Sequence, residues 1–198
     1  MATDLNLLVE NLRKTFTVDG KTVCVVGAGG GQIVNLYQGA EKILALDTDK
    51  AALMRLDEAL TAEGLRSRAE LFNLDFLSFG RHSDVVVFEF SLHEMDHPLL
   101  ALMHARDLAD EVVVVDHSPD SSWAWYACEE EKVKESMHAI QSVGFRKQTV
   151  FSGIQTFKNR SDVQQRIGSQ GPVAIERTIA LSEDEPVSIP MNYHLTLI

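Results

Sequence analysis

A run of glycines directly after a short apolar run is the feature that most constrains what this chain can fold into. Residues 23–26 are apolar and mostly β-branched, residues 27–31 read Gly-Ala-Gly-Gly-Gly, and an apolar, helix-compatible pattern resumes at Ile33. This order predicts a strand, a tight turn and the start of a helix. Glycine suits such a turn because its backbone takes positive φ, and because a Cβ would hold a ligand away from the amides at the helix N-terminus. We therefore expect an anionic or polar group of a ligand to lie against the turn.

The spacing of the glycines separates two classes of cofactor. The dinucleotide pattern G-x-G-x-x-G/A needs a small third residue, and this chain has Gln32 at that position. The pattern G-x-G-x-G fits instead, on Gly27, Gly29 and Gly31. It resembles motif I of the class I S-adenosylmethionine-dependent methyltransferases. That resemblance implies S-adenosylmethionine as cofactor, bound by these three glycines and by Ala28.

Apolar runs and helical patterns alternate along the rest of the chain. We predict strands over 21–26, 42–47, 69–74, 84–90, 111–116, 145–154 and 192–198, and helices over 4–16, 31–38, 50–63, 98–108, within 123–143, and over 161–167 and 172–181. Strands that alternate with helices predict an α/β fold with a parallel sheet. The interval 76–83 is too short for a full crossover helix, so a single turn or a loop is expected there.

The order of these elements predicts the architecture. The last strand follows a polar, partly helical segment, which indicates an antiparallel partner for the sixth strand. The outline is a Rossmann-like, seven-stranded, mostly parallel sheet with helices on both faces and an antiparallel C-terminal strand. From residue 21 to the end of the chain it resembles the class I methyltransferase fold. We expect a single domain over 1–198, with a helical cap over 1–20 and a helical insertion over 158–188.

Composition and charge narrow the partners. The chain of 198 residues is 45% hydrophobic and carries a formal net charge of -11, which disfavours binding to a phosphate backbone. The two cysteines, Cys24 and Cys128, form no disulfide framework. No targeting segment is evident at the N-terminus, and no apolar run approaches the roughly 20 residues that span a bilayer. We expect a soluble, cytoplasmic protein with a small-molecule substrate and no nucleic-acid or membrane partner.

Acidic residues stand where successive strands of the predicted sheet end, and ligands of open α/β sheets bind at that edge. Asp47, followed by Thr48, ends the second strand, and Asp75 with Phe76 follows the third. In the family that the chain resembles, these positions bind the ribose hydroxyls and the adenine. Asp47 would equally suit a nicotinamide ribose. The simpler alternatives are a helix N-cap at Asp47, a turn residue at Asp75 and a core residue at Phe76.

One position departs from the family pattern. Many members carry an acidic residue two positions before the first glycine, where it helps to hold the methionine ammonium group, and this chain has Val25. Either water and backbone carbonyls take that role, or Glu89 reaches in from the fourth strand. We include Glu89 among the cofactor-binding residues.

A histidine-rich segment follows the fourth strand. His93-Glu94-x-x-His97 matches the zinc-peptidase motif, but that motif requires a helix that places both histidines on one face. Pro98 disfavours helical backbone at His97, so a metallopeptidase is not expected. Six of the seven histidines lie between His82 and His138, which leaves another kind of metal site open. Our prediction is nevertheless that the protein binds no metal.

Polar and aromatic residues cluster after the fifth strand. Asp116 and His117 end that strand, and an aromatic group follows at Trp123, Trp125 and Tyr126. Rings with a few polar groups are typical of a substrate pocket, and we assign these residues to one. The alternative is that the rings are core contacts and the polar residues cap a helix. The acidic run 129–131 is interpreted as a solvated first helical turn.

The leading hypothesis is an S-adenosylmethionine-dependent methyltransferase that acts on a small molecule. Ser91 and Glu94 complete the predicted substrate pocket. Methyl transfer needs a base only where the acceptor must lose a proton, and His93 and His117 are the candidate catalytic bases. Two alternatives remain: a nucleotide-dependent oxidoreductase on a Rossmann sheet, and a domain that binds S-adenosylmethionine without catalysis.

Overall fold

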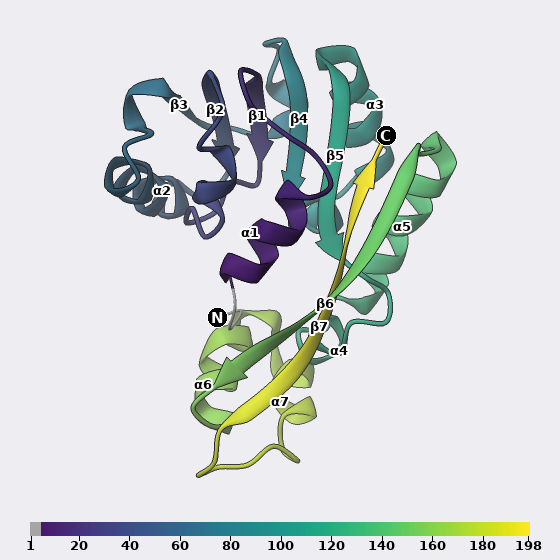
Figure 1. Ribbon diagram of the computed structural model, residues 1–198. Helices are drawn as coiled ribbons and strands as arrows, with labels where there is room; N and C mark the ends of the chain where they lie inside the picture. The colour runs from purple at the N-terminus through teal and green to yellow at the C-terminus, as the bar shows by residue number, and fades with distance from the viewer. Residues whose placement is uncertain (1–4) are drawn as a thin grey trace.

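The computed structural model describes residues 5–198 and contains one seven-stranded sheet of order β3-β2-β1-β4-β5-β7-β6 (Figure 1). The strands are β1 Thr22–Val26, β2 Lys42–Asp47, β3 Ala69–Asn73, β4 Ser83–Glu89, β5 Ala109–His117, β6 Lys147–Phe157 and β7 Val187–Leu197. The first five strands are parallel, and β7 is antiparallel to both β5 and β6. The predicted fold class is confirmed. The first residue of the predicted N-terminal helix, Asp4, lies outside the described residues.

Helices cover both faces of the sheet. They are α1 Leu5–Arg13, α2 Lys50–Ala62, α3 Pro98–Leu108, α4 Ser122–Tyr126, α5 Glu130–Val143, α6 Arg160–Ile167 and α7 Pro172–Arg177, with 3-10 turns η1 Val34–Tyr37, η2 Arg66–Arg68, η3 Phe76–Ser78, η4 Leu92–Glu94 and η5 Gly168–Gln170. Alternation along β1 divides the core, because successive side chains of a strand point to opposite faces. Val23 and Val25 pack with α1 and α2, whereas Cys24 and Val26 pack with α3 and α5.

The register of the parallel strands brings their carboxyl ends to one edge. Val26 lies opposite Leu46 of β2 and Phe88 of β4, and Asp47 lies opposite Asn73 of β3. Figure 1 shows β1, β4 and β5 pointing toward α1 and toward the far end of the β6–β7 hairpin. The residues that follow these strands therefore meet beneath α1.

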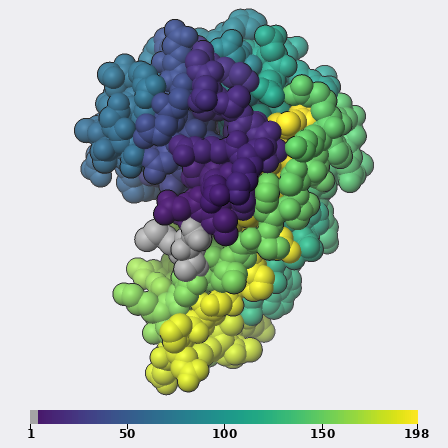
Figure 2. Space-filling model, viewed as in Figure 1, coloured from purple at the N-terminus to yellow at the C-terminus, as the bar shows by residue number. Residues whose placement is uncertain are grey.

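The β6–β7 hairpin is longer than predicted. Lys147 to Phe157 pairs along its whole length with Val187 to Leu197, and the hairpin carries α6, η5 and α7 at its far end (Figures 1 and 2). The predicted start of the last strand at residue 192 is wrong by five residues. Pro190 lies in the part of β7 that pairs only with β6, and proline is tolerated where one side of a strand is unpaired.

The predicted helix over 31–38 is also wrong, since only the 3-10 turn η1 forms there. Few residues separate Gly31, at φ +74°, from the start of β2, and the β-branched Ile33 and Val34 lower the propensity for an α-helix. The predicted single turn over 76–83 is confirmed as η3. The segment 123–143 divides into α4 and α5 at Cys128, whose φ is +58°. Among the helices of residues 5–198, none combines the length and the apolar character that a membrane crossing requires.

Candidate functional site

The glycine loop joins the end of β1 to its neighbours in two ways. A Cβ on Gly27 would lie 2.2 Å from Cβ of Ser91, and the Ser91 hydroxyl donates a 2.7 Å hydrogen bond to the Val26 carbonyl. Gly27 therefore lets the loops after β1 and β4 meet. A Cβ on Gly31 would lie 2.9 Å from Cβ of Ala59 on α2, so this glycine serves helix packing. Ala28 is buried and its amide donates to the carbonyl of Leu46.

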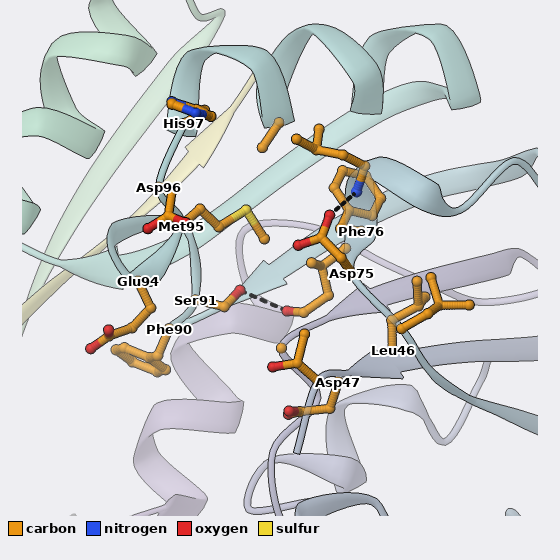
Figure 3. Close-up of a pocket in the computed structure, with 16 residues that line it drawn as sticks. Leu46, Asp47, Asp75, Phe76, Phe90, Ser91, Glu94, Met95, Asp96 and His97 are labelled. Atoms are coloured by element: carbon orange, nitrogen blue, oxygen red, sulfur yellow. Dashed lines mark hydrogen bonds between the residues drawn. The ribbon is translucent and has the colours of Figure 1, made fainter. Parts of the chain in front are cut away.

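A cavity of about 520 Å³ opens at the carboxyl ends of β1, β2 and β4 (Figure 3). Asp47 and Asp75 lie on one side of it, and Glu94 and Asp96 lie on the other. The Asp47 carboxylate accepts hydrogen bonds from the amides of Gly29, at 2.9 Å, and of Asp49, at 2.8 Å. These bonds fix its orientation and attach the glycine loop to β2.

The far end of this cavity combines a carboxylate with apolar rings. Asp75 caps η3 by accepting a 2.8 Å hydrogen bond from the Leu77 amide. Phe76 is buried and packs edge-to-face against Phe88 and His104. Asp75 is therefore a turn residue and Phe76 a core residue, as the simpler alternatives from the sequence state. Both residues also line the cavity, as does Thr48.

A second cavity of about 240 Å³ adjoins the first, and the two share Gly27 and Phe90. Leu5 and Leu8 of α1 close one side of it. The other lining groups come from the glycine loop, from the ends of β4 and β5, from α4, α6 and the hairpin: Gly29, Gly30, Gln32, Ile33, Glu89, His117, Trp123, Gln155, Arg166 and Met191. Phe90, which takes the left-handed backbone conformation at φ +47°, was not among the site residues predicted from the sequence.

Glu89 brings a buried carboxyl group into the second cavity. It is 9% exposed, and the Tyr37 hydroxyl donates a 3.1 Å hydrogen bond to its Oε2. Burial raises the pKa of Glu89 to about 8, against the lowering effect of that hydrogen bond. The charged form of a buried carboxyl group with a raised pKa is stabilised when a cation binds next to it.

The two candidate bases lie together at the end of β5, with ring centroids 5.3 Å apart. Nδ1 of His93 lies 2.5 Å from Oδ1 of Asp116, which is fully buried and also accepts from the amides of His93 and His117. Burial lowers the pKa of His93, but the carboxylates of Asp116 and Glu94 outweigh it and raise that pKa to about 10. Burial lowers the pKa of His117 to about 4. At neutral pH His93 is therefore the charged ring and His117 the neutral one.

His93 and His97 do not form the peptidase arrangement. His93 lies in the η4 turn, and His97 precedes Pro98 with φ −136°, outside helical geometry. Pro98 is the first residue of α3, and His97 before it is not helical, as predicted from the sequence.

The interpretation of residues 129–131 as a solvated turn is wrong for Glu129. This side chain is 7% exposed, and one carboxylate oxygen lies 3.8 Å from Nε2 of His93. The positive φ of Cys128 separates α4 from α5, and Glu129, the residue directly before α5, is turned inward. Burial raises the pKa of Glu129 to about 7.

The structure divides the predicted substrate residues. Trp123 is buried, stacks on Phe157 and lines the second cavity. Trp125 is 46% exposed, with the Arg177 guanidinium 4.7 Å from its ring and Tyr126 packed edge-to-face against it. The expectation that the whole aromatic group lines one pocket is therefore corrected. Ser91 and Glu94 line the first cavity, and Asp116 is fully buried, where it bonds His93 and the amide of His117.

Comparisons with known proteins identify the fold. No family model and no curated protein sequence matches the chain. Among solved structures, a Bacillus halodurans protein assigned as a methyltransferase has a TM-score of 0.69 at 16% identity, covering 98% of this chain and 97% of its own. Precorrin 8W decarboxylase of Methanobacterium thermoautotrophicum has a TM-score of 0.63 at 16% identity, covering 99% and 90%.

A third similar structure carries a ligand. Magnesium protoporphyrin IX methyltransferase of Synechocystis PCC 6803, with bound S-adenosylhomocysteine, has a TM-score of 0.56 at 12% identity, covering 97% of this chain and 80% of its own. At these identities the similarities show the fold. The chain has the Rossmann-like fold of the class I S-adenosylmethionine-dependent methyltransferases, over nearly its whole length.

Proposed function

We propose that this protein is an S-adenosylmethionine-dependent methyltransferase that acts on a small molecule. The observation that carries the proposal is the pair of adjoining cavities on one edge of the sheet, which meet at Gly27 and Phe90. The first cavity offers Asp47 for the ribose hydroxyls, and Asp75 with Phe76 for the adenine. The second offers a carboxyl group at Glu89 and apolar walls from Trp123 and α1.

The junction between the cavities suits the sulfonium end of the cofactor. Gly27 and Gly29 present backbone without side chains there, and Glu89 lies beside them with no basic partner in the described contacts. We propose that Glu89 binds the methionine ammonium group. It would take the role of the acidic residue that many family members carry at the position of Val25. The methyl group would then face the second cavity, which is where the acceptor binds. Holding donor and acceptor in line is the main catalytic requirement of this displacement.

The size of the second cavity and the net charge of the chain favour a small acceptor. A cavity of about 240 Å³ between α1, α4 and the hairpin has the size for a small molecule. The net charge of -11 is unfavourable for RNA or DNA. His117, which is neutral at neutral pH and lines this cavity, is the group placed to accept a proton from the acceptor.

The test is calorimetric titration of the purified protein with S-adenosylmethionine, S-adenosylhomocysteine and NAD. We expect saturable binding of one molecule of S-adenosylhomocysteine and none of NAD. Binding of NAD alone would identify an oxidoreductase, and binding of neither nucleoside would overturn the proposal. Incubation of the protein with methyl-labelled cofactor and a fractionated cell extract then tests the acceptor. Label should enter the low-molecular-weight fraction and not the RNA or protein fraction.

A further inference from the structure

Three buried side chains next to the second cavity bring metal-binding atoms together. They are His93 from η4, His117 from the end of β5 and Glu129 directly before α5. One ring nitrogen from each histidine and one carboxylate oxygen of Glu129 all lie within 4.8 Å of one another. Each of the three residues is at most 7% exposed. Two imidazoles and one carboxylate form a donor set that suits zinc and related divalent metals.

We propose that His93, His117 and Glu129 bind a zinc ion, in place of the expectation from the sequence that the protein binds no metal. Zinc–ligand bonds of about 2.0–2.2 Å in a tetrahedron place neighbouring ligand atoms roughly 3.3 Å apart. Nε2 of His93 already lies 3.8 Å from a carboxylate oxygen of Glu129. The remaining separations need side-chain shifts on the order of 1 Å, which rotation of an imidazole or a carboxylate supplies.

The atoms behind these ligands are arranged as zinc sites require. Nδ1 of His93 is bonded to Asp116, so its Nε2 is the nitrogen that faces Glu129. The other carboxylate oxygen of Glu129 accepts a 3.0 Å hydrogen bond from the side-chain amide of Gln170. A carboxylate behind a metal-binding histidine fixes its ring orientation and makes the free nitrogen more basic.

A second observation comes from His117. Its Nδ1 is buried and has no hydrogen-bond partner among the described residues. A buried polar atom without a hydrogen-bond partner carries a free-energy cost. Coordination of a metal ion by this nitrogen would remove that cost, whereas no other described side chain satisfies it.

The local charge favours a divalent cation. The carboxylates of Asp116, Glu129 and Glu94 all lie near the His93 ring, with Glu94 at 3.4 Å from Nε2. The basic side chain near these carboxylates is Lys132, which is paired with Glu94 at 2.6 Å, and Arg166 lines the second cavity. A divalent cation at this point would be balanced by these carboxylates.

Three protein ligands leave one position of a tetrahedral zinc ion open, as in catalytic and not in structural zinc sites. His117 lines the second cavity, so the open position is accessible from there. An acceptor with a thiol or hydroxyl group would bind the ion as its anion and release its proton to solvent, because a coordinated metal lowers the pKa of such a group. With zinc bound, His117 would be a ligand and would not accept that proton. This role for the ion rests on the proposed function, whereas the binding of zinc does not.

The experiment titrates chelator-treated protein with ZnCl₂ by calorimetry, and with CoCl₂ while the visible absorption of cobalt is recorded. We expect one zinc ion per chain and the intense visible bands of tetrahedral cobalt. Glu129→Gln and His117→Ala should each weaken zinc binding by about tenfold or more. Glu131→Gln and His138→Ala are the matched controls, since both side chains are exposed on α5, and their zinc affinity should equal that of the unmodified protein.

Folding and cofactor binding are measured on the same samples. At the same zinc concentration, zinc should raise the melting temperature of the unmodified protein by more than that of Glu129→Gln. This comparison holds even if His117→Ala fails to fold. Absence of saturable zinc binding, or equal affinity in Glu129→Gln, would overturn the metal site. Titration with S-adenosylhomocysteine in the presence of chelator separates the two proposals. Binding there with no zinc site retains the methyltransferase and removes the metal.

Discussion

The phenolic oxygen of Tyr37 lies 3.1 Å from Oε2 of Glu89, and both side chains are buried where η1 meets the end of β4. This contact positions the carboxyl group of Glu89 beside the glycine loop, on the strand next to β1. An acidic group thus reaches the methionine end of the proposed cofactor site from β4, although β1 carries Val25. The displaced carboxyl group has two measurable consequences.

The first prediction concerns the pH dependence of cofactor binding. The pKa of Glu89 is raised to about 8, so the carboxyl group is protonated in the ligand-free protein at neutral pH. Binding of the methionine ammonium requires the carboxylate, and the cost of removing the proton falls as the pH rises toward 8. Affinity for S-adenosylhomocysteine should therefore rise between pH 6 and pH 8, by up to about tenfold per pH unit.

Calorimetry in buffers of different ionisation enthalpy measures this effect directly. We expect close to one proton released per ligand bound at pH 6.5. In Glu89→Gln the release should disappear and the affinity should become independent of pH in this range. Proton release that persists in Glu89→Gln would assign it to another group.

The second prediction concerns the stability of the ligand-free protein. The pKa of Glu89 is higher in the folded protein than in the unfolded chain, so folding binds a proton between about pH 4.5 and pH 8. Stability from this group is therefore lost as the pH rises through that window. Glu89→Gln should be more stable at pH 8, by about 1–3 kcal/mol, and equally stable at pH 4.5.

Thermal unfolding measures the difference, since 1 kcal/mol corresponds to about 2–4 °C in a domain of this size. Glu135→Gln, at an exposed position on α5, is the control and should leave the melting temperature unchanged. A lower melting temperature for Glu89→Gln at pH 8 would contradict the prediction.

The third prediction places Asp47 in the cofactor site. Asp47→Ala should weaken S-adenosylhomocysteine binding about 30-fold or more, because a carboxylate bonded to ribose hydroxyls contributes on the order of 2–4 kcal/mol. The neighbouring Asp49 caps α2 by accepting from the Ala51 amide and is exposed. Asp49→Ala should lower stability by about 1 kcal/mol and leave affinity within threefold. Equal affinity losses in the two variants would assign the effect of Asp47 to the loop it supports and not to the ligand.

Much of the fold could be predicted because local patterns encode it. The buried valines of β4 and β5 read as strands, and the carboxyl ends of parallel strands must share an edge, which placed Asp47 and Asp75 in one cavity. The inward turn of Glu129 could not be predicted in this way. It depends on the positive φ of Cys128, a conformation that nothing local to cysteine favours.

Contacts between distant segments could not be predicted from the sequence either. Gln170 bonds Glu129, and Arg177 covers Trp125, only because the hairpin brings the segment between β6 and β7 back to α4 and α5. Sequence spacing carries no signal for such a pairing. This is why the aromatic group was assigned to one pocket, although only Trp123 faces it.

The fourth prediction concerns the two effects of a side chain at Gly27, which are strain in a backbone of positive φ and a clash with Ser91. Its φ of +66° and that of Gly64, +71°, are nearly equal, but a Cβ on Gly64 meets no atom within 4 Å, whereas one on Gly27 meets Ser91 at 2.2 Å. Gly64→Ala should therefore cost only the backbone term of about 1–2 kcal/mol. Gly27→Ala should cost more and should also reduce S-adenosylhomocysteine binding. Equal melting temperatures for the two variants would show that the loops after β1 and β4 separate at little cost.

The last prediction concerns Phe90, the side chain shared by both cavities. Its ring packs 5.1 Å from that of His117 and 6.2 Å from that of Tyr193, while its backbone lies in the left-handed region at φ +47°. Phe90→Ala and Phe90→Gly lose the same ring contacts. They differ in the backbone, where alanine keeps a penalty of about 1–2 kcal/mol and glycine has none.

Phe90→Gly should therefore melt about 2–4 °C or more above Phe90→Ala, the reverse of the order usual inside a strand or helix. Both variants remove the ring that lines both cavities, so both should lose affinity for S-adenosylhomocysteine to a similar extent. An alanine variant as stable as the glycine variant would show that the loop after β4 relaxes once the ring is gone. Phe90 would then adopt its backbone conformation only because its ring packs between the two cavities.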